Sequence, residues 1–238
     1  MKDFLQELYK NLSYVLECGL IVLAVAVIVK LVERKLPEVR KVSKARRITI
    51  IAVCSAVAAV LHMLDFPLLF LAPVFYKLDF SELPVMLCGF FLGPGAAIGC
   101  EAVKIILKLL LKGTSTAFIG DFANFAVGCS LVLPAVIVYH MGKRRKNAII
   151  GLAVGIAFLT IFGSAFNAVY LLPKFSQFVL PLDTIVAMGA KINGNIHSVT
   201  TFVLLCVAPL NLLKGISVSL LTMLLYKRVA RPLFGIRE

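Results

Sequence analysis

Ala72-Pro73-Val74-Phe75-Tyr76-Lys77-Leu78-Asp79-Phe80-Ser81-Glu82-Leu83-Pro84 is the stretch of this chain from which its fold is best read. It places prolines, aromatic rings and carboxylates between two strongly apolar segments. Because loops carry binding groups more often than the elements that they connect, a loop of this composition between membrane helices indicates a functional site.

The composition of the whole chain is that of an integral membrane protein. Of its 238 residues, 61% are hydrophobic and 16% are charged, and the mean hydropathy is +0.98. These values lie far outside the range of soluble globular domains. We therefore expect an all-α membrane protein with room for six or seven spans of about 20 residues, and without room for an attached ATPase domain.

The apolar segments divide the chain into an added helix and a six-helix core. Residues 12–32 follow a charge-balanced tail and lack the positive-then-apolar order of a signal peptide, which predicts a retained helix; a helix lying on the membrane surface is the alternative. We expect residues 1–47 to form an additional N-terminal transmembrane helix with a basic linker that contains Pro37, and residues 48–238 to form the core. The core helices are expected at about 48–64, 81–92, 96–111, 118–140, 148–172 and 199–226, with a tight turn at 93–95 and a polar stretch at 173–197.

The basic residues predict the orientation. The net charge of +13 comes largely from three clusters that flank apolar segments, at 34–47, 143–146 and 227–237. The positive-inside rule places these clusters and the C-terminus in the cytoplasm and the N-terminus outside. The loops at 65–80, 113–116 and 173–197 then lie together on the outer side. Nucleic-acid binding is disfavoured, because no basic and aromatic groove pattern accompanies the charge.

Several enzyme and metal functions lack their sequence signals. The six cysteines lie in apolar surroundings without a C-x-x-C pair, and the three histidines are scattered. The chain contains neither a G-x-x-x-x-G-K-[ST] phosphate loop nor a nucleophile signature. We expect a binder or carrier, with no catalytic residue, metal or cofactor.

Two polar residues stand out in the last apolar segment. Asn211 and Lys214 share one helix face. Pro209, which favours a kink in the helix, lies two residues before Asn211. Lys214 precedes Tyr226 by twelve residues, or roughly 18 Å of helix, which is too deep for simple snorkelling to the cytoplasm. A ligand contact is one interpretation, and an internal hydrogen bond or ion pair is the other.

Other intramembrane polar groups add candidates. Asn124 and Asn167 carry amides that suit a flat, neutral heteroaromatic edge, although an interhelical hydrogen bond is an equal alternative. Charged residues at three- or four-residue spacing form a stripe on the helix at 96–111 and just after it. We expect Glu101 to pair with Lys104 and Lys112 to reach the outer headgroups. Lys108 lies near mid-membrane and needs a cavity or a partner.

Small residues on the first core helix form a second kind of candidate surface. Ala52 and Ala56 are four residues apart on one face, which is the small-xxx-small spacing that lets another helix approach closely. Ordinary packing within the bundle would produce the same spacing.

Four segments together resemble a known family. They are the helix with Ala52 and Ala56, the loop at 77–84, the run Gly120-Asp121-Phe122-Ala123-Asn124-Phe125, and Pro209-Leu210-Asn211-Leu212-Leu213-Lys214. In these segments the chain resembles the substrate-binding S component of an energy-coupling factor (ECF) vitamin transporter of the riboflavin type, over roughly residues 48–230. Asp121 stands where the family pattern has a glutamate, and the helix at 12–32 is additional to that pattern.

The resemblance implies a site, partners and a location. Riboflavin would be the transported ligand, with its ring edge held by Asn167, Asn211 and Lys214 and the loop around Leu78 and Asp79 closing over it. Asn124 and Tyr170 are further candidate contacts. The face with Ala52 and Ala56 would dock on an ECF transmembrane coupling subunit, which works with two ATP-binding subunits in the plasma membrane of a prokaryote.

Other functions remain open on the sequence. An S component for FMN or another vitamin is possible because a pocket lysine can meet a phosphate. A stand-alone secondary transporter would show an inverted repeat, and the hydropathy pattern has none. A non-transporting scaffold would pair its intramembrane polar residues with one another.

Overall fold

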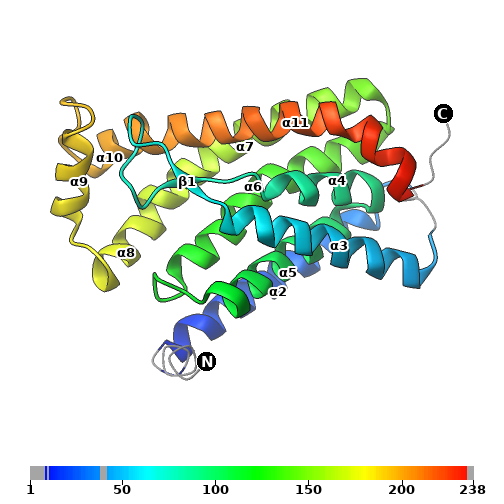
Figure 1. Cartoon of the computed structure of the whole chain (residues 1–238), viewed down its shortest axis with the longest axis horizontal. Coiled ribbons are helices and arrows are strands. Elements are labelled where there is room, and N and C mark those ends of the chain that lie inside the picture. The colour runs from blue at the N-terminus through cyan, green and yellow to red at the C-terminus, as the bar shows by residue number, and fades with distance from the viewer. Residues whose placement is uncertain (1–8, 10, 38–41, 235–238) are drawn as a thin grey trace.

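The computed structural model describes residue 9 and residues 11–37 and 42–234, which form a helix bundle with one small two-stranded ladder. Residues 38–41 of the predicted basic linker and residues 235–238 of the predicted cytoplasmic terminus lie outside the described residues. Most of the helices run roughly along a common long axis, and α9 (Leu182–Ala190) crosses one end of the bundle (Figure 1). The start of α2 (Leu12–Glu33) lies at the same end as α8 (Leu172–Phe178) and α9, and the C-terminal part of α11 (Ala208–Phe234) lies at the opposite end.

Five helical runs in the described part of the chain are long and apolar enough to cross a membrane. They are α2, α3 (Lys44–Met63), α6 (Ile119–Gly142), the continuous run 145–178 that begins with α7 (Arg145–Phe166), and the run 199–226 that begins with α10 (Val199–Phe202). The predicted all-α membrane class is therefore confirmed.

Two core helices differ from simple spans. α4 (Glu82–Leu92) has 11 residues, all of them buried, and at about 16 Å it is much shorter than a hydrocarbon core of about 30 Å. α5 (Pro94–Lys112) is 19 residues long and carries the predicted stripe of charged residues. α4 thus fills the middle of the bundle, and the count of seven spans stays a prediction.

Local sequence signals explain where several of these helices begin. The Ser43 hydroxyl accepts a hydrogen bond from the Arg46 N–H and caps α3. Gly93 has φ 96° between α4 and α5, and Pro94 occupies the first turn of α5. The predicted tight turn is confirmed, because a left-handed residue followed by proline ends one helix and starts the next.

Glycines bring α6 and α7 together. A Cβ on Gly151 or Gly155 would lie only 2.5 Å from the carbonyl oxygen of Ala135 or Leu131, respectively. The backbones of α6 and α7 therefore approach closely along this face, which is how small residues act in membrane helix pairs.

The loop after α3 is partly ordered by a ladder. β1 (Phe66–Pro67) pairs antiparallel with β2 (Lys77–Leu78), with Phe66 opposite Leu78. The ladder closes the intervening segment into a hairpin-like loop that lies across one end of the bundle (Figure 1).

The stretch at 173–197 that was predicted as polar contains two helices, because α8 continues the run from α7 and α9 follows it. Two π-helical turns interrupt the long runs, η1 (Asn167–Leu171) before α8 and η2 (Val203–Val207) between α10 and α11. The two turns lie against each other. Inserted π turns often occur at functional sites.

The N-terminal helix packs on the core along α5. Val29 is buried against residues of α5 and α6. At the end of α2, the Glu33 carboxylate occupies the place that a side chain on Gly95 would need, and it lies 3.8 Å from the Arg47 guanidinium. A carboxylate beside the first turn of α5 is favourable for the helix dipole. α2 is thus fixed to the core at this end, and its treatment as a separate unit stays a prediction.

Candidate functional site

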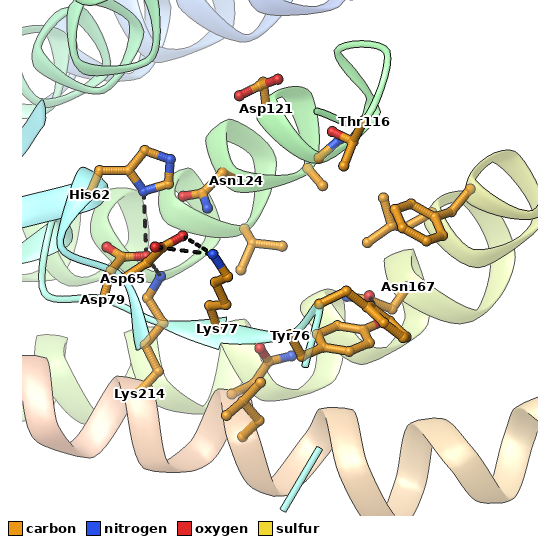
Figure 2. Close-up of a pocket in the computed structure, with 18 of the residues that line it drawn as sticks. His62, Asp65, Tyr76, Lys77, Asp79, Thr116, Asp121, Asn124, Asn167 and Lys214 are labelled. Atoms are coloured by element: carbon orange, nitrogen blue, oxygen red, sulfur yellow. Dashed lines mark hydrogen bonds and ion pairs between the residues drawn. The ribbon is translucent and has the colours of Figure 1, made fainter. Parts of the chain in front are cut away.

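A cavity of about 240 Å³ with many polar and charged groups in its lining lies beneath the 65–80 loop. Its walls come from α3, α5, α6, η1, α8 and α11, and the loop itself forms its cover (Figure 2). Groups as far apart in the chain as His62 and Lys214 therefore face one space. The lining residues include His62, Tyr76, Asp79, Asn124, Asn167, Asn211 and Lys214.

Three amides face this cavity, and they differ in their partners. Asn167 donates through Nδ2 to the Gly163 carbonyl at 2.7 Å and accepts at Oδ1 from the Tyr76 hydroxyl at 2.6 Å. The Oδ1 of Asn124 and the Nδ2 of Asn211 are buried without a hydrogen-bond partner among the described residues. Unpaired buried amide groups are costly, so both atoms are available to a ligand.

Lys214 is paired from two sides. Its Nζ lies 3.2 Å from Oδ2 of Asp79 and 3.0 Å from Oε1 of Glu82. Asp79 also accepts from the Ser81 N–H at 2.8 Å, and its Oδ2 lies 3.5 Å from Nδ1 of His62. The alternative of an internal ion pair is thus realised for Lys214, while its side chain still borders the cavity.

The electrostatics of Asp79 follow from these neighbours. Burial alone raises the pKa of the Asp79 carboxyl, but the Lys214 ammonium and the His62 ring outweigh burial and hold this pKa well below its ordinary value. Asp79 therefore stays ionised and keeps the loop attached to α11.

A second buried pair continues from the first. Lys104 contacts Glu101, as the helical spacing predicts, and also lies 3.4 Å from Glu82 and 3.1 Å from the Ser81 hydroxyl. Glu82 therefore joins the two lysines, and the ion pairs run without a break from the loop into α5. Gly128 leaves room for the carboxylates of this network, because a Cβ there would clash with Glu101.

The cavity lining is balanced in charge. It contains three aspartates and three lysines. Lys77 pairs with Asp65 at 3.2 Å and Lys108 pairs with Asp121, so each lysine of the lining has a carboxylate partner. Lys108 thus has the partner that its position near mid-membrane was predicted to need. Because the charges of the lining balance, it favours a ligand without net charge.

The loop fills part of the space under it with two aromatic rings. The Phe75 ring stacks on Phe175 with centroids 5.5 Å apart, and the Tyr76 ring lies 6.0 Å from that of Phe202. In Figure 2 the labelled Tyr76 side chain lies directly beside Asn167. A ligand that contacts Asn167 must therefore displace the Tyr76 hydroxyl.

The structure brings five of the seven sequence-predicted ligand residues together around the cavity. Leu78 is buried in β2, and Tyr170 of η1 stacks on Phe166 and packs near Tyr14; neither lines the cavity. His62 and Tyr76 were missed by the sequence reasoning. The five residues that share the cavity are Asp79, Asn124, Asn167, Asn211 and Lys214.

The small-residue face lies elsewhere. Ala52 and Ala56 are both exposed on the outside of α3, whereas Ser55 and Ala59 on the neighbouring face are buried. No described part of the chain covers the two alanines, so a partner helix could approach them.

A helical membrane bundle with a cavity under a loop is the arrangement expected of a membrane protein that binds a small solute. A family profile described as the substrate-specific component of ECF transporters matches residues 46–226. The chain therefore belongs to this family, whose members are transporter components and not enzymes. The additional helix α2 lies outside the matched residues.

Individual relatives agree with the profile. The chain is 34% identical over 185 residues to the riboflavin transporter RibU of Staphylococcus aureus (strain TCH60), which covers 78% of this chain and 90% of that protein. It is 28% identical over 184 residues to the riboflavin transporter FmnP of Bacillus subtilis (strain 168), covering 77% and 91%, respectively. A solved structure of the S component of a bacterial ECF transporter superposes with a TM-score of 0.62 at 33% identity, covering 81% of this chain and 99% of the other.

Proposed function

We propose that this chain is the riboflavin-binding subunit of an ECF uptake transporter. Membership in the family and the riboflavin transporters among its relatives support the ligand class. The observation that carries the proposal is the pair of unpaired amide atoms, on Asn124 and Asn211, in a cavity with no surplus charge. A flavin ring offers donors and acceptors along one flat, neutral edge, which matches such groups.

The residues then have distinct roles. Asn211 supplies an unpaired donor to the ring edge, and Asn167 becomes available when the Tyr76 hydroxyl leaves it. Lys214 contributes a cation that is already compensated by Asp79 and Glu82. The loop that carries Asp79 closes the cavity over the bound vitamin.

FMN is disfavoured by the ion pairs of the lining. Its phosphate would need a cation, and Lys77, Lys108 and Lys214 each already have a carboxylate partner. Binding a phosphate at Lys108 or Lys214 would weaken its ion pair with a buried carboxylate, Asp121 or Asp79, which is costly. Riboflavin should therefore bind more tightly than FMN.

Transport requires partners that supply energy. We infer a transmembrane coupling subunit, docked on the Ala52 and Ala56 face, and two ATP-binding subunits in the plasma membrane of a prokaryote. The start of α2 and the C-terminal part of α11 lie at opposite ends of the bundle (Figure 1), which supports an external N-terminus and a cytoplasmic C-terminus.

The intramembrane charges alone would also suit a scaffold, because Glu82, Glu101, Lys104 and Lys214 pair with one another. The unpaired amides in the same region favour a binder over a scaffold. Family membership likewise favours an S component over a stand-alone secondary transporter.

Titration of the purified protein with riboflavin tests the proposal. Flavin fluorescence should fall with one-to-one saturation, and FMN should bind more weakly in the same assay. Absence of saturable flavin binding by a protein that melts cooperatively would refute the proposed ligand.

A further inference from the structure

An apolar groove lies on the side of the bundle away from the cavity. It has a volume of about 490 Å³ and lies between α2 on one side and α6 with α7 on the other. Ser130 and Tyr170 are the hydroxyl-bearing side chains in its lining, and the Ser130 hydroxyl already donates to the Val127 carbonyl at 2.6 Å. The groove therefore offers apolar contact along nearly its whole length.

One wall of the groove is a stripe of aromatic rings. Phe158, Phe162, Phe166 and Tyr170 follow one another at four-residue spacing, with successive ring centroids 5.7, 5.7 and 5.1 Å apart. The stripe spans roughly 18 Å of helix, compared with about 15 Å for one leaflet of a hydrocarbon core of about 30 Å. Its length therefore fits an acyl chain of one leaflet.

A cation continues the stripe at the same spacing. Lys174 follows Tyr170 by four residues, and its Nζ lies 5.9 Å from the centroid of the Tyr14 ring on α2. Lys174 has no ion pair with any described residue, unlike the lysines of the cavity. A lysine beside a tyrosine ring, near the end of an apolar channel, has the arrangement expected at a membrane interface.

We propose that this groove binds a membrane glycerophospholipid, with one acyl chain along the aromatic stripe and the phosphate at Lys174. Unpaired ammonium and phosphate are complementary in charge, and Lys174 follows the stripe on one continuous helical run, beyond its Tyr170 end. The wall formed by α2 comes from outside the residues that match the family profile. The lipid site is therefore created by the additional helix.

The size of the groove argues against a whole protein helix as its occupant. A helix of about 10 Å diameter that spans about 30 Å fills roughly 2,400 Å³, which is several times the volume of the groove. A partner helix could insert only its side chains, and those would not explain an unpaired cation at the end of the groove.

The sequence provides a clean optical test, because it contains no tryptophan. The Phe162→Trp variant places one fluorophore in the groove, and the Leu224→Trp variant places one on an exposed site of α11. Both full-length proteins are titrated in detergent with phosphatidylglycerol that carries bromine on its acyl chains, a heavy-atom quencher. Thermal melting of each variant checks that it is folded.

Quenching of the groove tryptophan should saturate at one lipid per chain, whereas quenching at 224 should rise only with the lipid-to-detergent ratio. Adding Lys174→Gln should weaken the saturable phase by about fivefold, the loss expected for one cation at a lipid headgroup. Lys191→Gln, at an exposed lysine after α9, should leave it unchanged. Brominated phosphatidylethanolamine tests whether the phosphate alone suffices.

Three results would overturn the proposal. They are non-saturating quenching at 162, equal effects of the two lysine variants, and a groove tryptophan that is shielded from lipid in a protein with the mass of a dimer. The last result would assign the groove to a second copy of the chain.

Discussion

Asn211→Leu should lower riboflavin affinity without lowering the stability of the protein. The Nδ2 atom of Asn211 has no hydrogen-bond partner among the described residues, so the substitution breaks no side-chain hydrogen bond to that nitrogen. Leucine has the same branching as asparagine. Its neighbour Gly163 presents no side chain to position 211, since a Cβ on Gly163 would lie only 2.8 Å from Asn211 Nδ2.

The magnitude follows from the bond to the ligand. A hydrogen bond lost in a dry pocket costs about 1–3 kcal/mol when its partner stays buried, which corresponds to about 5- to 150-fold in the dissociation constant. Lys214→Leu should behave differently, because it leaves the Asp79 carboxylate without its lysine partner and leaves Glu82 with Lys104 alone. Breaking a buried ion pair on one side costs about 3–5 kcal/mol, so that variant should lose thermal stability as well as affinity.

The assay is a flavin fluorescence titration paired with thermal melting of the unliganded protein. Leu212→Ala, at an exposed position on the same helix, is the matched control and should keep both affinity and melting temperature. Unchanged affinity of Asn211→Leu would remove this residue from the site. A melting temperature as low as that of Lys214→Leu would show that the amide holds the bundle together and has no vacant hydrogen-bonding position.

Three further outcomes are expected. Tryptophan at both Ala52 and Ala56 should abolish co-purification with the coupling subunit and leave riboflavin affinity intact, because both residues are exposed and far from the cavity lining; intact complexes would show that another face docks. Deleting residues 1–36 should leave riboflavin titrations unchanged, since no cavity-lining residue belongs to α2; loss of binding would mean that this helix shapes the cavity. Gly163→Ala should weaken binding by pushing against the α11 amide, whereas Gly99→Ala, whose Cβ meets nothing within 4 Å, should not; equal titration curves for the two variants would contradict the close approach.

Patterns local to one helix were predictable from the sequence. Apolar runs gave the all-α class, and the Gly93 and Pro94 pair gave the turn between α4 and α5. The three-residue spacing of Glu101 and Lys104 gave their ion pair. In each case the signal and the structure depend on neighbours along the same segment.

Contacts that depend on tertiary folding were not predictable in the same way. Glu82 pairs with Lys104 and Lys214, which lie 22 and 132 residues away, and nothing near Glu82 in the sequence indicates either partner. His62 looks isolated until the loop brings Asp79 to within 3.5 Å of it.

Two features of the structure have a backbone cause that the sequence does not reveal. Pro173 lies in the stretch predicted as polar, and it is tolerated within a helical run because it occupies the first turn of α8. Asn167 and Tyr170 both lie in the π turn η1, in which hydrogen bonds run from i to i+5, so α-helical spacing does not predict which of them faces the cavity. Asn167 lines the cavity and Tyr170 does not, while the role of Tyr170 in ligand binding stays a prediction.

That π turn also bears on how this helical run tolerates changes in length. A π turn holds one residue more than an α-helical turn, so it takes up an extra residue locally and leaves the helices on either side nearly in phase. Removing a single residue from 167–171 would therefore restore regular α-helix while α7 and α8 kept nearly their present orientations. The side chains within 167–171 would change direction instead. Natural length variation at this position would change which of these side chains face the cavity without any substitution elsewhere.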